Sequence, residues 1–307
     1  MEMRKVFAAE LEQLMRKNKK ICLLDADLAK ASGTIKLREI FPNRAFDVGI
    51  AEQNMASVAA GLSAYGFIPF ITTFTPFATG RICDQIAVSI AYGGQNVKIV
   101  GTDPGIAAEL NGGTHMSFED IAVLRSIPDI VIFEPVDTAQ LRQALPQIVK
   151  CDKPCYIRMF RKETPDVFTD PKYKFNLYKA DKICDGKDIS IFVSGLCTAD
   201  AVEAKNILAK EGISAEVINV HTIKPIDAEA IVKSAAKTGR VLTVENHNVK
   251  GGLYSAVCEV LAKECPTKSD CVGIQDQFGE VGKIPQLKER YGMTVADIVE
   301  KAKALVG

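Results

Sequence analysis

Short apolar runs alternate with helix-periodic segments along most of the chain. Buried strands are predicted at residues 21–24, 67–72, 97–101, 130–134, 155–160, 189–194, 215–220 and 241–245. Helices are predicted around residues 6–15, 51–65, 78–92, 118–127, 138–149, 198–211, 228–237 and 252–262. Such alternation favours parallel sheets with crossover helices. The pattern therefore predicts the α/β class with doubly wound sheets.

A polar stretch interrupts this alternation past the middle of the chain. Between positions 161 and 188 there is no apolar period, and Pro165, Pro171 and Gly186 punctuate the segment. We therefore predict two doubly wound domains, residues 1–163 and 188–307, joined by a linker at 164–187. Both are of ordinary domain size.

Charge and apolar run length argue against two classes of partner, although a neutral chain can still carry a local basic patch. The 307 residues contain 38 Lys and Arg against 38 Asp and Glu, so the formal net charge is zero. No summed attraction to a nucleic acid results. The apolar runs are far shorter than the ~18–20 residues that cross a bilayer, and the first five residues lead into no apolar signal region. We expect a cytoplasmic protein that binds neither nucleic acid nor membrane.

Cysteine and histidine content argues against a metal site held by this chain alone. Nine cysteines are scattered over the sequence without a Cys-x-x-Cys pair, and there are only three histidines. Zinc ligands cannot be assembled from them at familiar spacings. We predict structural thiols and no metal ligands.

Three segments near predicted strand ends are candidates for chemistry. Glu52 lies in the first turn of an apolar helix, where it either complements the helix dipole or shares a proton with a ligand nitrogen. Phe74 and Phe77 either extend the core or present a flat wall to a heteroaromatic ring. His115 follows two glycines and is either a structural histidine or a ligand contact.

Longer motifs around these positions carry a family resemblance. The motifs are VGIAEQNM at 48–55, AGLSAYG at 60–66, PFITTF at 69–74, Phe77, Arg81, DQI at 84–86, GGTH at 112–115, Glu119-Asp120, TIKPID at 222–227, VENHN at 244–248, Gly251-Gly252 and FGE at 278–280. Together they resemble transketolases and deoxyxylulose-phosphate synthases over essentially the whole chain. The resemblance implies a thiamine-diphosphate pyrimidine-binding domain followed by a transketolase C-terminal domain.

The resemblance also implies a partner. The family holds the diphosphate of thiamine diphosphate through Mg²⁺ and a Gly-Asp-Gly motif, which this sequence lacks. The chain therefore resembles the C-terminal half of a split transketolase, a glycolaldehyde transferase of carbohydrate metabolism. It would be active only with an N-terminal partner subunit that holds most of the Mg²⁺ site, within an α2β2 heterotetramer in which the chain also self-associates.

The resemblance assigns cofactor roles to four residues. Glu52 would hydrogen-bond the aminopyrimidine nitrogen and act as a catalytic residue. Phe77, with Phe74 beside it, would stack on the pyrimidine ring. Asp27 falls where the family has an acid near the cofactor.

Substrate roles follow in the same way. His115 would meet the sugar hydroxyls and take part in catalysis, while Arg161 and Arg4 would grip a distal phosphate of the sugar phosphate. Ser32 would assist them. Asp103 and Asn111 complete the implied substrate contacts.

Three positions depart from the family pattern. Transketolases usually have His where Asp103 stands, an acid at Asn111 and Gln at Met116. These differences argue for a specialised transketolase that accepts a branched ketose or a sulfonated ketose whose terminal anion Arg161 would hold. Three alternatives stay open: a deoxyxylulose-phosphate-synthase-like enzyme, a 2-oxoacid dehydrogenase β subunit, and a scaffolding or regulatory relative.

Overall fold

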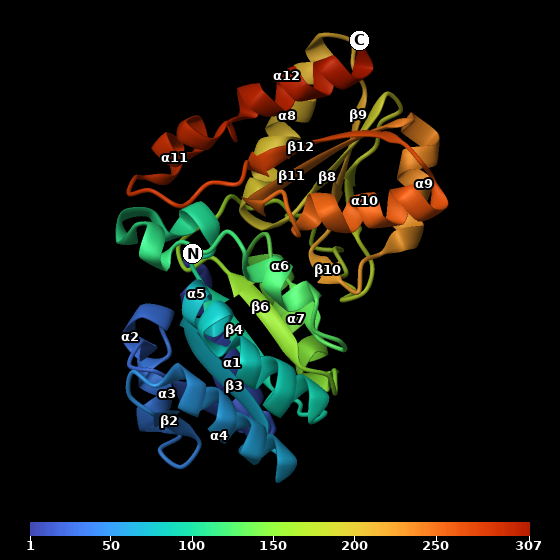
Figure 1. Cartoon of the computed structure of the whole chain (residues 1–307). Helices are drawn as coiled ribbons and strands as arrows, with labels where there is room; N and C mark the ends of the chain where they lie inside the picture. The colour runs from blue at the N-terminus through green and yellow to red at the C-terminus, as the bar shows by residue number, and fades with distance from the viewer. The chain divides into compact units, whose positions relative to one another are not determined.

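The computed structural model describes residues 1 to 307 and contains two compact α/β units. The first consists of residues 1–104 and 123–177, and the second of residues 105–122 and 178–307. In each unit a mainly parallel sheet is packed against helices (Figure 1). The predicted fold class is therefore confirmed. The segment 105–122, which lies within the predicted first domain, packs with the second unit.

The strands of the first unit pair in parallel in the order β5-β6-β4-β3-β1-β2. Their bounds are β1 (Ile21–Asp25), β2 (Ala45–Asp47), β3 (Ile68–Phe74), β4 (Lys98–Thr102), β5 (Val131–Phe133) and β6 (Cys155–Met159). After β2, at one edge of the sheet, the chain crosses to the other side of β1 and adds β3 and β4, and β6 later inserts between β4 and β5. Ligands of open α/β sheets bind at the carboxyl ends of the strands beside such changes of strand order.

Helices of the first unit form the layers around this sheet. They are α1 (Met3–Lys17), α2 (Ala29–Ser32), α3 (Ile35–Ile40), α4 (Glu52–Ala64) and α7 (Thr138–Lys150). The apolar stripe of α1 is fully buried, and Phe7 meets Phe70 of β3 with ring centroids 6.3 Å apart. Burial of this stripe is the main stabilisation of the helix.

The segment predicted as one helix over residues 78–92 is divided into three pieces. They are the short α5 (Thr75–Ala78), a 3₁₀ turn η1 (Gly80–Ile82) and a π-helical segment η2 (Gln85–Tyr92). Thr79, with φ −134° and ψ −83°, breaks the α-helical path between the first two. π-Helical segments occur frequently at functional sites, and this one packs against α4.

The predicted linker, residues 164–187, is only partly a connection. Residues 173–177 are held to α7 by hydrogen bonds, and strand β7 (Asp181–Cys184) of the second unit lies in its second half. Gln147 donates to the carbonyl of Phe175 at 2.8 Å and accepts from the backbone N–H of Leu177 at 3.0 Å. Gln143 accepts from the N–H of Phe175 at 3.0 Å. Phe175 and Leu177 are buried in the core of the first unit. A polar segment without apolar periodicity therefore docks through side-chain amides.

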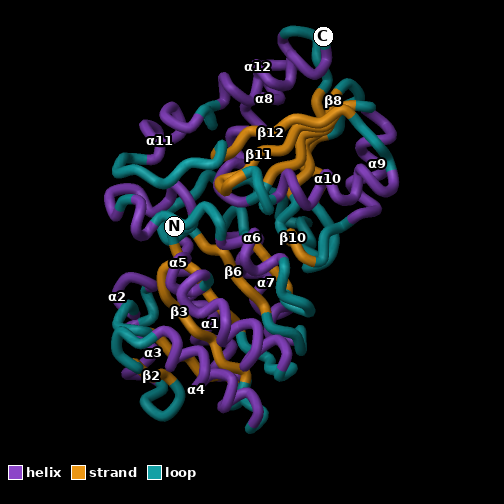
Figure 2. Tube along the Cα trace, in the orientation of Figure 1, coloured by secondary structure: helices purple, strands orange, loops and turns teal.

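The second unit has strand order β12-β11-β8-β9-β7, and only β7 runs antiparallel to its neighbour. The strands are β7 (Asp181–Cys184), β8 (Ile189–Val193), β9 (Ala215–Asn219), β11 (Arg240–Asn248) and β12 (Lys268–Ile274), with β10 (Thr222–Lys224) following β9. Figure 2 shows β8, β11 and β12 of this sheet between helices on its two faces.

Helices α8 (Thr198–Lys210) and α12 (Val295–Val306) pack together in one layer of the second unit, and α9 (Ala228–Thr238) and α10 (Leu253–Glu264) pack together in the other. The remaining helical segments are η3 (Gly105–Asn111), η4 (Gly113–His115), α6 (Asp120–Arg125), η5 (Gly195–Cys197) and α11 (Ile284–Tyr291). Across the chain, no helix has both the length and the apolar content needed to span a membrane.

Candidate functional site

The carboxyl ends of the first unit's strands carry a continuous row of contacting side chains. The row runs through Glu52, Arg81, Phe77, Phe74, Arg161 and Asp103. Glu52 opens α4, Phe74 ends β3, Asp103 follows β4 and Arg161 follows β6. The parallel sheet therefore gathers at one edge residues that are more than a hundred positions apart in sequence.

One end of the row is the ion pair of Glu52 with the guanidinium of Arg81. Glu52 is 5% exposed, and its Oε1 accepts a hydrogen bond from Arg81 Nη1 at 2.9 Å. The guanidinium of Arg81 also covers the Phe77 ring, with Cζ 3.9 Å from the centroid. Arg81 is 44% exposed, so this planar group lies at the surface. The helix-dipole alternative for Glu52 is therefore incomplete, because its carboxylate has a specific side-chain partner.

Two aromatic rings form the middle of the row. Phe74 and Phe77 meet edge to face with centroids 6.2 Å apart, and both are half-buried. The guanidinium of Arg161 lies 4.8 Å from the Phe74 centroid. Each ring thus has one face in contact with a cation.

The other end of the row is a buried ion pair. The carboxylate of Asp103, 2% exposed, accepts hydrogen bonds from Arg161 Nε at 2.5 Å and from the Arg161 backbone N–H at 3.1 Å. Arg161 Nη2 also contacts the same carboxylate. Burial raises the pKa of the Asp103 carboxyl, while the hydrogen bonds and charge of Arg161 oppose that rise.

Arg4 joins this end through a shared acceptor. Its Nη1 donates to the carbonyl of Ala31 at 3.2 Å, and Arg161 Nη1 lies 3.5 Å from the same oxygen. Glu2 accepts from Arg4 Nε at 3.1 Å and Nη2 at 3.2 Å. Ser32 is 1% exposed, and its hydroxyl donates to the carbonyl of Leu28 at 2.7 Å. The structure thus brings the two arginines together and uses the Ser32 hydroxyl within its own helix.

Asp27 lies on the Arg4 side of the site. It is exposed and has φ +60°, and its backbone N–H donates to Asp47 Oδ1 at 3.0 Å. With Arg4, Lys30 and Gly33 it lines an open cavity of about 810 Å³. Asp27 therefore faces the cavity beside the arginine pair.

His115 and Asn111 lie in the second unit, on the segment 105–122. Asn111 is exposed, and His115 is half-exposed with its Nδ1 2.9 Å from the hydroxyl of Thr114. The loop packs tightly: a Cβ added to Gly113 would lie 2.4 Å from the carbonyl oxygen of Gly279. The third departing position, Met116, is 5% exposed and packs on Gly279. Its side chain is part of the core there.

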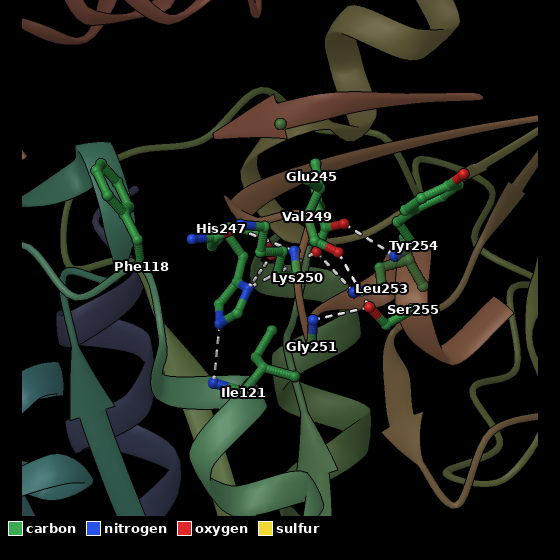
Figure 3. A network of polar contacts seen from close by, with 12 residues as sticks. Phe118, Ile121, Glu245, His247, Val249, Lys250, Gly251, Leu253, Tyr254 and Ser255 are labelled. Carbon is green, nitrogen blue, oxygen red and sulfur yellow. Dashed lines mark hydrogen bonds and ion pairs between the residues drawn. The ribbon is translucent and has the colours of Figure 1, made fainter. Parts of the chain in front are cut away.

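The VENHN motif ties this segment to the second unit. Asn246 Oδ1 accepts from the N–H of Ile106 at 2.9 Å, and the Asn248 N–H donates to the carbonyl of Phe118 at 2.9 Å. The ring of His247 points toward Ile121, whose N–H donates to Nε2 at 3.2 Å (Figure 3).

The same motif caps a helix. Both carboxylate oxygens of Glu245 accept backbone N–H bonds at the start of α10, from Leu253 at 2.6 Å and Tyr254 at 2.9 Å (Figure 3). A Cβ at Gly252 would lie 2.0 Å from Glu245 Oε2, so this position requires glycine. Glu245 and His247 are fully buried. This motif is used for structure.

Sequence reasoning did not assign roles to Arg81 and Glu2, although Arg81 belongs to the quoted motifs. A signal for Arg81 was its position four residues after Phe77, on the segment that follows the aromatic loop. No group of three or more His, Cys, Asp or Glu side chains converges as a metal site in the structure.

The residues at the Glu52 end fit an aminopyrimidine. The guanidinium of Arg81 is a planar N–C–N group that covers Phe77 and donates to Glu52 at the same time. A planar ligand with an amidine-like N–C–N edge can therefore stack on the Phe77 ring and reach the Glu52 carboxylate.

Two polar groups lie unpaired at the end of β3. The buried hydroxyls of Thr72 and Thr73 have no hydrogen-bond partner.

Both units of the chain are similar to known proteins. Residues 1–166 match the family model "Transketolase, pyrimidine binding domain", and residues 178–298 match "Transketolase, C-terminal domain". The 6-deoxy-6-sulfo-D-fructose transketolase subunit of Clostridium sp. (strain MSTE9) is 50% identical over 98% of this chain and 93% of its own length. An apulose-4-phosphate transketolase subunit of Phocaeicola vulgatus is 36% identical over 99% of this chain and 97% of its own.

A solved structure is also similar. A split-gene transketolase, determined as an inactive beta4 tetramer, has 42% sequence identity and a TM-score of 0.90, covering 100% of this chain and 98% of that one.

Proposed function

The chain belongs to the transketolase family, and we propose that it is the pyrimidine-binding subunit of a split, thiamine-diphosphate-dependent transketolase that moves a two-carbon ketol unit from a ketose to an aldose. When bound, thiamine diphosphate supplies the carbon centre that carries this unit. The observation that carries the proposal is the contact of one planar N–H group with both Phe77 and Glu52.

Glu52 performs the proton-handling role in this proposal. Its buried carboxyl would hydrogen-bond the ring nitrogen of the aminopyrimidine, in the place that the partly exposed guanidinium of Arg81 occupies. A carboxyl in this position holds a proton on that edge and so favours the tautomer that acts as a base. Phe77 fixes the ring plane, with Phe74 behind it.

The arginine pair binds the far end of the donor. Arg161 and Arg4 converge on the carbonyl of Ala31, a neutral acceptor that an anionic group of the ketose replaces. Given the 50% identity to a sulfofructose transketolase subunit, we propose a sulfonated ketose as the donor. His115 would contact the sugar hydroxyls near the reacting carbonyl.

A partner subunit completes the enzyme. The proposed assembly is α2β2, with Mg²⁺ and the diphosphate held mainly by an N-terminal subunit. Exposed apolar side chains support subunit contacts. Val58 on α4 and Tyr65 directly after it are 40% and 88% exposed, and Val88 and Tyr92 on η2 are 57% and 91% exposed. Contiguous exposed apolar patches mark interaction sites.

Reconstitution with the partner tests the proposal. The chain is co-expressed with the product of a neighbouring gene that encodes Gly-Asp-Gly, and ketol transfer is followed with and without thiamine diphosphate and Mg²⁺. We expect transfer only when the partner and the cofactors are all present. Robust transfer by the isolated chain would contradict the split-subunit assignment.

A matched variant tests the apolar surface. Tyr92→Glu introduces a charge into it and is expected to abolish assembly, as measured by analytical ultracentrifugation. Lys19→Glu, a charge change at an exposed turn on another part of the unit, is the control and should assemble normally.

A further inference from the structure

Asp103, the buried acid at the arginine end of the row, sets the orientation of the Arg161 guanidinium. All the hydrogen bonds that reach the Asp103 carboxylate come from N–H donors of Arg161: the backbone N–H, Nε and the contact from Nη2. An acceptor surrounded by donors is the ionised form. Two of the three nitrogens of the guanidinium fork are therefore directed at Asp103.

Only one arm of Arg161 remains for a ligand. Arg161 Nη1 lies 3.5 Å from the carbonyl of Ala31, which also accepts from Arg4 Nη1 at 3.2 Å. These are long contacts to a neutral oxygen, so an anion displaces them readily. The ligand is thus held by one arm from each arginine rather than by a bidentate fork.

The charges at this end are almost balanced. Arg161 is paired with Asp103, and Arg4 is paired with Glu2, which Lys5 also contacts at 3.2 Å. These five groups together leave one positive charge. The other charged side chains that line the cavity, Glu12, Asp27, Lys30 and Lys36, cancel one another. Asp103 is 2% exposed, so water screens its charge poorly.

Terminal groups of sugars differ in the charge they bring to such a site. A phosphate monoester carries about −1.5 to −2 near pH 7, because its second pKa is near 6. A sulfonate has three similar oxygens but a single negative charge. The second charge of a phosphate would be repelled by the buried carboxylate of Asp103.

We propose that Asp103 is the specificity-determining residue of the donor site, because it occupies the fork of Arg161 and limits the terminal group to one negative charge. The inference rests on the proposed transferase function and adds the residue and the charge rule that select the donor. Asp103 acts through Arg161 and is a positioning residue.

The experiment uses the reconstituted complex and two donors that differ at the terminal group, 6-deoxy-6-sulfofructose and fructose 6-phosphate. Asp103→Asn removes the charge and keeps an oxygen that accepts from Arg161. Asparagine also tolerates the φ of +53° at this position. We expect the kcat/KM ratio of sulfonate to phosphate donor to fall at least about tenfold, mainly through a lower KM for the phosphate.

A matched control is Glu134→Gln, in another buried acid–arginine pair of this unit, Glu134 with Arg158 at 2.6 Å. It removes a buried charge outside the row of contacts, so the donor ratio should stay within about twofold of the parent. A ratio that shifts equally in both variants would overturn the assignment to Asp103.

The outcomes separate this inference from the function itself. If the wild-type complex transfers from neither donor, the proposed function fails. If Asp103→Asn transfers with an unchanged donor ratio, the role of Asp103 is wrong and the function stands.

A second measurement applies if Asp103→Asn does not assemble. In the wild-type complex, lowering the pH through about 6 protonates the phosphate ester but not the sulfonate. The kcat/KM of the phosphate donor should then rise relative to that of the sulfonate donor. A ratio independent of pH would contradict the charge rule.

Discussion

The two units have the same architecture but use the carboxyl ends of their strands in opposite ways. In the first unit, Glu52 and Asp103 are bound to arginine side chains that are 44% and 15% exposed. In the second, Glu245 and His247 are fully buried and bonded to backbone groups.

This difference separates a site from a structural network. A side-chain partner that reaches the surface can be replaced by a ligand, because rotation of one residue frees the acceptor. A backbone N–H held in a helix start or a packed loop cannot leave without local unfolding. Buried polar groups therefore mark function only when their partners are replaceable.

Loss of the acid at the first edge should have the largest effect. Glu52→Gln keeps a hydrogen bond to Arg81 but cannot hold the charge, so we expect kcat of the complex to fall about 10³-fold with an unchanged unfolding temperature. Steady-state transfer assays measure kcat, and thermal unfolding measures the unfolding temperature. Glu10→Gln, on α1 and paired with Arg142, is the control. Activity within about tenfold of the parent would break the comparison.

A pH titration of stability probes the second edge. Burial lowers the pKa of His221 to about 4, opposed by the carbonyl of Lys179. Between about pH 6.5 and 4, His221 is protonated in the unfolded chain but stays neutral in the folded chain. The free energy of unfolding therefore decreases as the pH falls through this range, by about 3 kcal/mol in total.

Unfolding of the wild type and of His221→Asn across this range tests that sign. As the pH decreases, the free energy of unfolding of the wild type should fall relative to that of the variant. A constant difference would mean that His221 titrates alike in both states.

Glu245→Gln is the counterpart of Glu52→Gln in the second unit. One of the two N–H groups at the start of α10 loses its acceptor, and the favourable charge at the helix start is removed. We expect a loss of about 2 kcal/mol in stability with kcat unchanged per folded complex. Glu264→Gln, exposed on the last turn of α10, should be neutral. A large drop in kcat without a loss of stability would assign chemistry to this edge.

The amide contacts of α7 should have the smallest effect. Gln143→Ala removes the bond to the Phe175 N–H and is expected to lower stability by about 1 kcal/mol. Hydrogen exchange of residues 164–177 should increase, whereas Gln13→Ala on the exposed face of α1 should leave it unchanged. Equal exchange in both variants would show that the docked segment does not depend on this amide.

Much of the fold follows from the sequence because strand and helix periods are local. The apolar runs at 21–24 and 155–160 coincide with β1 and β6 within a residue. The resemblance directed attention to Glu52, Phe77 and Arg161, and the structure places all three in one row of contacts.

Other features depend on long-range pairing, which periodicity does not encode. The docking of residues 173–177 depends on side-chain amides of α7, and the segment 105–122 joins the second unit through Asn246 and His247. In the sequence Asp103 only replaces the histidine usual in transketolases, and the role proposed for it rests on the contact of its carboxylate with Arg161, which the sequence does not reveal.

The most direct test of the contrast between the two edges is the rate at which the thiazolium C2 proton of thiamine diphosphate exchanges with deuterium in the reconstituted complex. Glu52→Gln should slow this exchange at least about a hundredfold, and Glu245→Gln should leave it at the wild-type rate. Equal exchange in all three complexes would contradict the account.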